Sequence, residues 1–150
     1  MLTRTEMQTE HRHIQVLIVD DQASFRRAAR SVVELTPGFE LVGEAATGEA
    51  SVAAAGALQP DLVLMDVHLP GIDGLEASRR ILGASGGQAP VIFLLSTYEA
   101  SDCMEDASEC GAVAYLSKAK FGSEWLSSAW AAARASARGW APNNSSGTRP

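Results

Sequence analysis

Residues 14–21 read IQVLIVDD, a short apolar and largely β-branched run that ends in two aspartates. A run of this length bounded by polar residues predicts a buried strand. The residues that follow have helical spacing, with apolar side chains at Phe25, Ala28, Ala29, Val32 and Val33. The opposite face of this helix carries charged residues: Arg26, Arg27, Arg30 and Glu34. Pro37-Gly38 ends that helix. This unit of one strand and one helix decides the fold because it recurs along the chain.

Four further apolar runs predict strands at Phe39–Gly43, Asp61–Met65, Val91–Leu95 and Ala112–Leu116. Helices are predicted between and after them, at Thr47–Leu58 with Thr47 as the N-cap, Gly74–Leu82, Ser101–Cys110 and Ser123–Arg138. The alternation predicts an α/β fold, a doubly wound parallel sheet of five strands with helices on both faces. The first, third and fourth runs are the most apolar and should be central. The flavodoxin-like (β/α)5 order 2-1-3-4-5 meets that requirement.

The composition excludes several classes of protein. The chain has 150 residues, 46% hydrophobic and 20% charged, which suits one globular domain and not a wholly disordered chain. Its net charge of −6 argues against non-specific binding to nucleic acid or to an anionic membrane. The longest apolar runs, about five residues, are too short to cross a bilayer. With no signal peptide evident, a cytoplasmic location is expected.

The domain boundaries follow from the same patterns. Residues 1–13 are polar and are expected to form a disordered N-terminal extension. Residues 14–138 hold all the predicted strands and helices. Residues 139–150 carry no apolar anchor beyond Trp140 and Ala141, and are expected to be a disordered tail or the start of a linker.

Polar side chains follow four of the predicted strands, at Asp20-Asp21, Asp66, Ser96 and Ser117-Lys118. The first and third strands are neighbours on either side of the switch point, so three carboxylates should converge in one crevice. Carboxylates gathered in this way repel one another, and a hard divalent cation such as Mg²⁺ removes that penalty. Lys118 and Ser96 supply a cation and a hydrogen-bond donor for phosphoryl oxygens. The set predicts a site for phosphoryl transfer onto a carboxylate.

Each of these residues alone has an ordinary explanation. Asp20-Asp21 could be a solvated turn, Asp66 could belong to turn chemistry with Pro70-Gly71, and a lone lysine is usually at the surface. The functional interpretation depends on their joint occurrence at successive strand ends.

Four stretches of the chain resemble the receiver domain of two-component response regulators: QVLIVDDQ (15–22), DLVLMDVHLPGIDGLEA (61–77), VIFLLSTYE (91–99) and GAVAYLSKA (111–119). The resemblance covers about residues 14–138. Residues 41–50, LVGEAATGEA, and the stretch YLSKA look most like the receivers of helix-turn-helix transcriptional regulators.

The resemblance implies a role for each site residue. Asp66 would accept a phosphoryl group from a sensor histidine kinase or a phosphotransfer protein. Asp21, Asp66 and the backbone carbonyl of His68 would ligate Mg²⁺, with Asp20 acting through water. Lys118 would pair with the phosphoryl group, and Ser96 would move to hydrogen-bond it. Tyr115 would be the aromatic residue whose rotamer follows that movement.

The resemblance also implies how the domain works. Phosphorylation would alter the surface formed by the fourth helix, the fifth strand and the fifth helix. The chain would catalyse only its own phosphorylation and dephosphorylation. It could form a homodimer, and it would bind no membrane and no nucleic acid directly, although a DNA-binding output domain could be missing. It is either a stand-alone receiver or part of a longer regulator.

Two other functions compete with this one. A phosphorylation-independent pseudo-receiver would bind partners only, but such chains usually lose an acidic residue or the lysine. An aspartate-nucleophile phosphatase of the haloacid dehalogenase type needs a second aspartate two residues after the first, where this chain has His68. A flavodoxin-like electron carrier is disfavoured because the first strand ends in acid, not in a phosphate loop.

Overall fold

The computed structural model describes residues 12–97 and 109–137. Its sheet has the strands β1 (Ile14–Val19), β2 (Phe39–Ala45), β3 (Leu62–Asp66), β4 (Val91–Ser96) and β5 (Ala114–Ser117). The strand order is β2-β1-β3-β4-β5 and every neighbouring pair is parallel. The predicted fold class and strand order are therefore confirmed.

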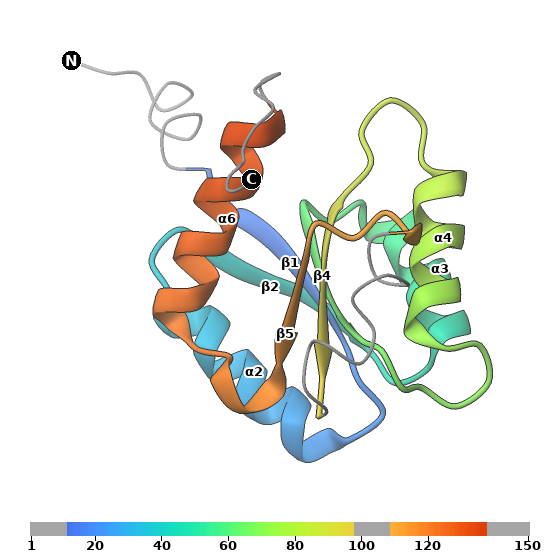
Figure 1. The fold of residues 1–150 in the computed structure, drawn as a ribbon, viewed down its shortest axis with the longest axis horizontal. Coiled ribbons are helices and arrows are strands. Elements are labelled where there is room, and N and C mark those ends of the chain that lie inside the picture. Colours follow the sequence, from blue (N-terminus) through green and yellow to red (C-terminus); the bar gives the residue numbers. More distant parts are fainter. Residues whose placement is uncertain (1–11, 98–108, 138–150) are drawn as a thin grey trace.

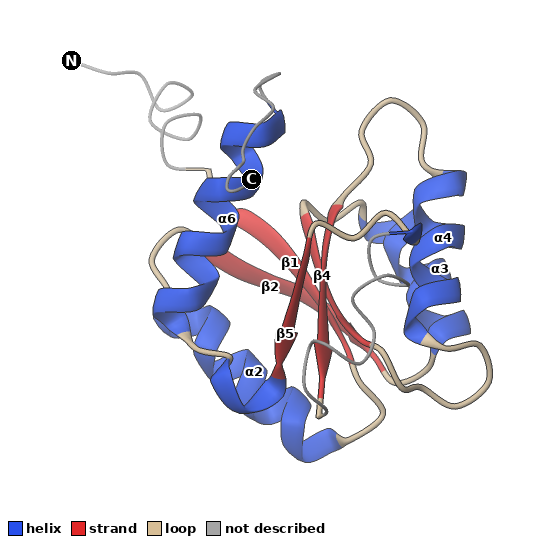
Figure 2. Cartoon of the chain, in the orientation of Figure 1, coloured by secondary structure: helices blue, strands red, loops and turns tan. Residues whose placement is uncertain are grey.

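Helices cover both faces of the sheet. They are α2 (Ala23–Leu35), α3 (Gly48–Leu58), α4 (Gly74–Ala84) and α6 (Ser123–Ala137), and a short 3-10 helix, η2, spans Lys118–Lys120. Figure 1 shows α2 and α6 on one face and α3 and α4 on the other. The same view coloured by secondary structure shows the strands enclosed between these two helical layers (Figure 2).

The alternation of side chains along each strand divides the core into two layers. Val16 and Ile18 of β1 pack towards α2 and α6, whereas Leu17 and Val19 pack towards α3 and α4. β3 is buried at all five of its positions. Strands covered on both faces need continuous apolar sequence, which explains the apolar runs Val16–Val19 in β1, Leu62–Met65 in β3 and Val91–Leu95 in β4.

Some predicted boundaries differ from the observed ones. β2 continues to Ala45, where the Asp20 amide donates to the Ala45 carbonyl at 3.0 Å. β5 begins at Ala114, two residues later than predicted, after a turn in which Gly111 has a left-handed φ of 96°. The predicted helix at Ser101–Cys110 falls almost entirely outside the described residues. The same is true of the two terminal segments predicted to be disordered.

Local hydrogen bonds explain where the helices start. Thr47 caps α3 as predicted, its hydroxyl oxygen accepting from the Ala50 amide at 3.0 Å. Asp73 caps α4 in the same way. By contrast, the residue before α2, Gln22, makes no side-chain cap. Its backbone amide instead donates to the Asp20 carboxylate at 2.8 Å, so the acidic pair stabilises the turn into α2.

Of the helices that the structure describes, none has the length and apolar character that a bilayer crossing requires.

A glycine at the start of α4 sets how closely this helix approaches β3. A Cβ at Gly74 would collide with the backbone carbonyl of Asp66 and lie 2.9 Å from the Cα of Val67. Gly74→Ala is therefore expected to lower the free energy of unfolding by about 1–3 kcal/mol. Gly56 is an exposed helical glycine whose Cβ would meet nothing within 4 Å, so Gly56→Ala should stabilise by about 0.5–1 kcal/mol. Urea denaturation of both variants checks this, and a Gly74→Ala protein as stable as wild type would contradict it.

Candidate functional site

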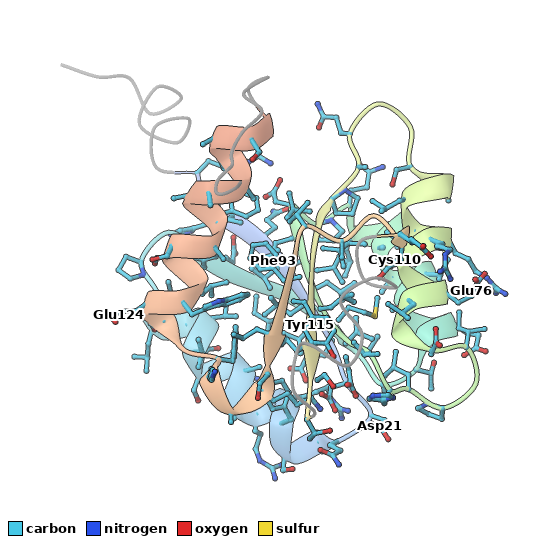
Figure 3. All side chains as sticks on the ribbon, viewed as in Figure 1. Asp21, Glu76, Phe93, Cys110, Tyr115 and Glu124 are labelled. Atoms are coloured by element: carbon cyan, nitrogen blue, oxygen red, sulfur yellow. The ribbon has the colours of Figure 1, made fainter. Side chains whose placement is uncertain are left out.

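Three carboxylates meet at the carboxyl ends of β1 and β3. The two strands pair in register up to Val19 and Met65, so the residues that follow them lie side by side. Oxygens of Asp20, Asp21 and Asp66 lie within 4.8 Å of one another, and in the part of the chain that the structure describes this is the one such group of metal-ligand side chains. Asp20 and Asp66 are buried and Asp21 is exposed, at the edge of the molecule labelled in Figure 3.

Lys118 brings a positive charge into this group of acids. Its Nζ lies 2.5 Å from Asp20 Oδ2 and 3.5 Å from Asp66 Oδ2. The lysine follows β5 directly, in the 3-10 helix η2, and its side chain is only 10% exposed. The structure thus brings together Asp20, Asp21, Asp66 and Lys118, as expected from their places at the strand ends.

Burial and the neighbouring acid together perturb Asp66. Desolvation, and then the charge of Asp20, raise the pKa of Asp66 from 3.8 to about 6, against the opposing effects of Lys118 and the His68 amide. This amide donates to Asp66 Oδ1 at 3.3 Å. The negative charge of the three carboxylates is therefore larger than the one ammonium of Lys118 can offset. A group of carboxylate oxygens with excess negative charge fits a divalent cation such as Mg²⁺.

The raised pKa of Asp66 predicts a pH-dependent effect of neutralising it. The folded state binds the Asp66 proton more tightly than the unfolded state does, so the charged carboxylate destabilises the metal-free fold above about pH 6 and not below about pH 4. In EDTA at pH 7, Asp66→Asn is expected to raise the free energy of unfolding by about 1–3 kcal/mol. The gain should vanish towards pH 4. Chemical denaturation of both proteins from pH 4 to 7 measures it, and an equal stability at pH 7 would refute this electrostatic account.

The other predicted site residues occupy the same end of the sheet or the strand beside it. Ser96 ends β4 and is fully buried, one residue beyond the strand partner of Asp66. His68 is exposed in the loop after β3. Tyr115 lies half buried on β5, against the core layer that faces α3 and α4, at the centre of the view in Figure 3.

Sequence reasoning missed two residues of α2 that contact the site. Arg26 was placed on the face of α2 opposite the apolar side chains, and it is half buried there and donates from Nη1 to the backbone carbonyl of Asp20 at 2.7 Å. Its Nε pairs with Glu44 of β2 at 3.2 Å, and Arg30 holds the same carboxylate at 2.6 Å. Phe25 packs against the core, as its place on the apolar face predicts, and the Lys118 Nζ also lies 4.6 Å from the centre of its ring. Their position in the first turn after the acidic pair was the available signal.

Comparison with known proteins identifies the family. Residues 16–129 match the model of the response regulator receiver domain. The chain belongs to this family. The receiver is 31% identical to a two-component response regulator of the LuxR family from Aurantimonas sp. SI85-9A1, with a TM-score of 0.73 over 83% of this chain and 86% of that one. The response regulator domain of Thermotoga maritima CheB is 28% identical, with a TM-score of 0.69 over 87% of this chain and 100% of that one.

Curated relatives of the receiver carry the name of an enzyme. A protein-glutamate methylesterase/protein-glutamine glutaminase of Geobacter sulfurreducens is 36% identical over 112 residues, 75% of this chain and 31% of that protein. One from Alkalilimnicola ehrlichii is 39% identical over 106 residues, 70% of this chain and 27% of that protein. The chain thus spans less than a third of the length of these relatives. They are not helix-turn-helix regulators, so the finer subfamily expected from residues 41–50 is not established.

Proposed function

We propose that this receiver accepts a phosphoryl group on Asp66 in a two-component signalling pathway. The observation that carries the proposal is the arrangement of a buried strand-end carboxylate beside two further carboxylates, with a lysine ammonium 3.5 Å away. The donor would be the phosphohistidine of a sensor histidine kinase or a phosphotransfer protein.

The chemistry follows from the charges of the side chains. An Asp66 carboxylate oxygen forms the new bond to phosphorus while the bond from phosphorus to the donor histidine nitrogen breaks. The electron pair of that bond stays on the imidazole, which then takes up a proton. Lys118 offsets the negative charge of the phosphoryl oxygens, and burial keeps competing water away from Asp66.

The acidic residues fit the metal that this transfer requires. Asp21, Asp66 and the backbone carbonyl of His68 would hold Mg²⁺ directly, and Asp20 would act through water. When bound, the ion supplies positive charge that offsets the charge of the incoming phosphoryl group. Without it, the cation shared by the two buried carboxylates, among the described residues, is the Lys118 ammonium.

The switch would transmit this event to the surface through β5. Ser96 and Lys118 are drawn towards the phosphoryl group, and Tyr115, three residues before Lys118, turns inward. The surface that changes includes β5 and α6, together with the predicted helix at Ser101–Cys110, most of which lies outside the described residues. A partner protein or a second copy of the receiver would read this surface. The chain itself would bind no nucleic acid.

The enzyme activities in the names of the relatives belong to those proteins, and the receiver would regulate an output domain of that kind. Both a helix-turn-helix output domain and a methylesterase output domain are compatible with this receiver, because a LuxR-family structure and methylesterases match it at 31–39% identity. A pseudo-receiver is not favoured, because this chain has all three acidic residues and the lysine, and the four side chains lie together in one site. The phosphatase is disfavoured by His68 in place of a second aspartate.

One incubation separates these functions. The protein is mixed with a small phosphodonor and Mg²⁺, and its intact mass is followed with and without EDTA. The proposal predicts uptake of one phosphoryl group that requires Mg²⁺. Sustained release of phosphate over many turnovers would support the phosphatase. Absence of any adduct, with the fold intact, would support the pseudo-receiver.

A further inference from the structure

The Lys118 ammonium is bounded by an aromatic ring as well as by acids. Asp20 and Asp66 lie on one side, at 2.5 and 3.5 Å. The ring of Phe25 lies on another, with its centre 4.6 Å from Nζ. Phe25 belongs to the first turn of α2, which follows the acidic pair directly. The ammonium therefore meets the site residues and Phe25 at once, and little of the lysine side chain reaches solvent.

The Phe25 ring is supported from behind by a row of aromatic side chains. Its centre lies 6.3 Å from that of Phe121, which lies 6.0 Å from Trp125. Trp125 in turn packs edge-on against Phe93 of β4, at 5.3 Å, and Phe93 is completely buried. Figure 3 shows Phe93 in the interior between the sheet and the orange helix α6. This row anchors Phe25 to the core, so its ring presents a fixed surface to the lysine.

The Phe25 ring matters for the position of Lys118 because Asp20 and Asp66 compete for the lysine ammonium. Phosphoryl transfer requires the ammonium beside Asp66, yet the shorter of its two ion pairs is with Asp20. A cation within about 6 Å of a ring centre is attracted by the negative face of that ring. This attraction is less directional than a hydrogen bond, so the ammonium can shift from Asp20 towards Asp66 without losing it.

We infer that Phe25 is a positioning residue, whose ring holds the Lys118 ammonium beside Asp66 by cation–π attraction and so speeds phosphoryl transfer. The inference rests on the proposed function. It assigns a specific requirement to position 25: an aromatic ring, and not merely an apolar side chain. A ring that only filled space could be replaced by leucine, whereas a ring that holds the cation could not.

The test compares side chains at position 25 that differ in the charge distribution of the ring. Phosphorylation rates are measured with a small phosphodonor and Mg²⁺. Phe25→Tyr and Phe25→Trp should stay near the wild-type rate. Phe25→Leu should be slower by about 2- to 30-fold. Because leucine also changes packing, 3,4,5-trifluorophenylalanine at position 25 provides a ring of nearly equal size with a weakened negative face, and its rate should fall in the same direction.

A matched control removes an aromatic ring elsewhere. Phe39 is buried on β2 and packs edge-on against Trp130 at 6.3 Å, so Phe39→Leu should lower stability but leave the phosphorylation rate unchanged. A wild-type rate with the trifluoro ring would overturn the inference and leave the proposed function standing. A wild-type protein that takes up no phosphoryl group would overturn both.

Discussion

Asp66→Asn is expected to take up no phosphoryl group under conditions in which the wild-type protein takes up one. The substitution keeps the size of the side chain and replaces the nucleophilic carboxylate by an amide, whose nitrogen is a poor nucleophile. The fold should survive, because removing a buried charge with a raised pKa stabilises the metal-free protein. The expected effect is therefore a loss of reaction without a loss of structure, read by intact mass and by thermal melting.

The matched control is Asp61, which lies just before β3 at the opposite end of the same strand. Its carboxylate accepts from the Gln15 amide at 2.8 Å and pairs with Arg12 at 3.1 Å, away from the acidic group. Asp61→Asn should take up the phosphoryl group at close to the wild-type rate. Uptake by Asp66→Asn at the wild-type level would show that another residue is the acceptor.

Lys118→Met is expected to slow phosphorylation by about 10²–10³-fold, the effect of removing one fixed charge-stabilising group from a buried reaction site. Methionine keeps the length and the apolar stem of the side chain but leaves Asp20 and Asp66 without the ammonium that lies between them. The rate is measured with a saturating small phosphodonor, so that donor binding does not limit it. Lys118→Arg should recover part of the loss because it restores the charge.

Lys120 provides the control for this substitution. It lies two residues further along the same 3-10 helix and is exposed. Lys120→Met changes the net charge of the protein equally, so a comparable loss of rate in this variant would assign the effect to overall charge. Normal phosphorylation of Lys118→Met would remove the lysine from the mechanism.

Sequence alone predicted the parts of this molecule that depend on strand ends. Parallel strands deliver their last residues to one edge of the sheet, so Asp20, Asp66 and Lys118 could be placed together once the strand order was inferred. That inference used only the contrast between continuous apolar runs and helical spacing. It needed no knowledge of how the side chains pack.

The contacts of α2 could not be predicted in this way. Helical periodicity divides a helix into an apolar and a polar face, and it placed Phe25 on the first and Arg26 on the second. The first turn of α2, however, passes beside the carboxyl end of β1. There Arg26 donates to the backbone carbonyl of Asp20, and Phe25 contacts Lys118. Such contacts depend on how the helix crosses the sheet, which a one-dimensional pattern does not contain.

Mapping the modified residue shows whether the Asp66 carboxylate is the group that captures phosphorus. The phosphorylated protein is treated with borohydride, which reduces an acyl phosphate to the alcohol and converts an aspartyl phosphate to homoserine. The protein is then digested and sequenced by mass spectrometry. Homoserine is expected at position 66 and at no other aspartate. Homoserine at position 20, 21 or 61, or an adduct that borohydride leaves unchanged, would contradict it.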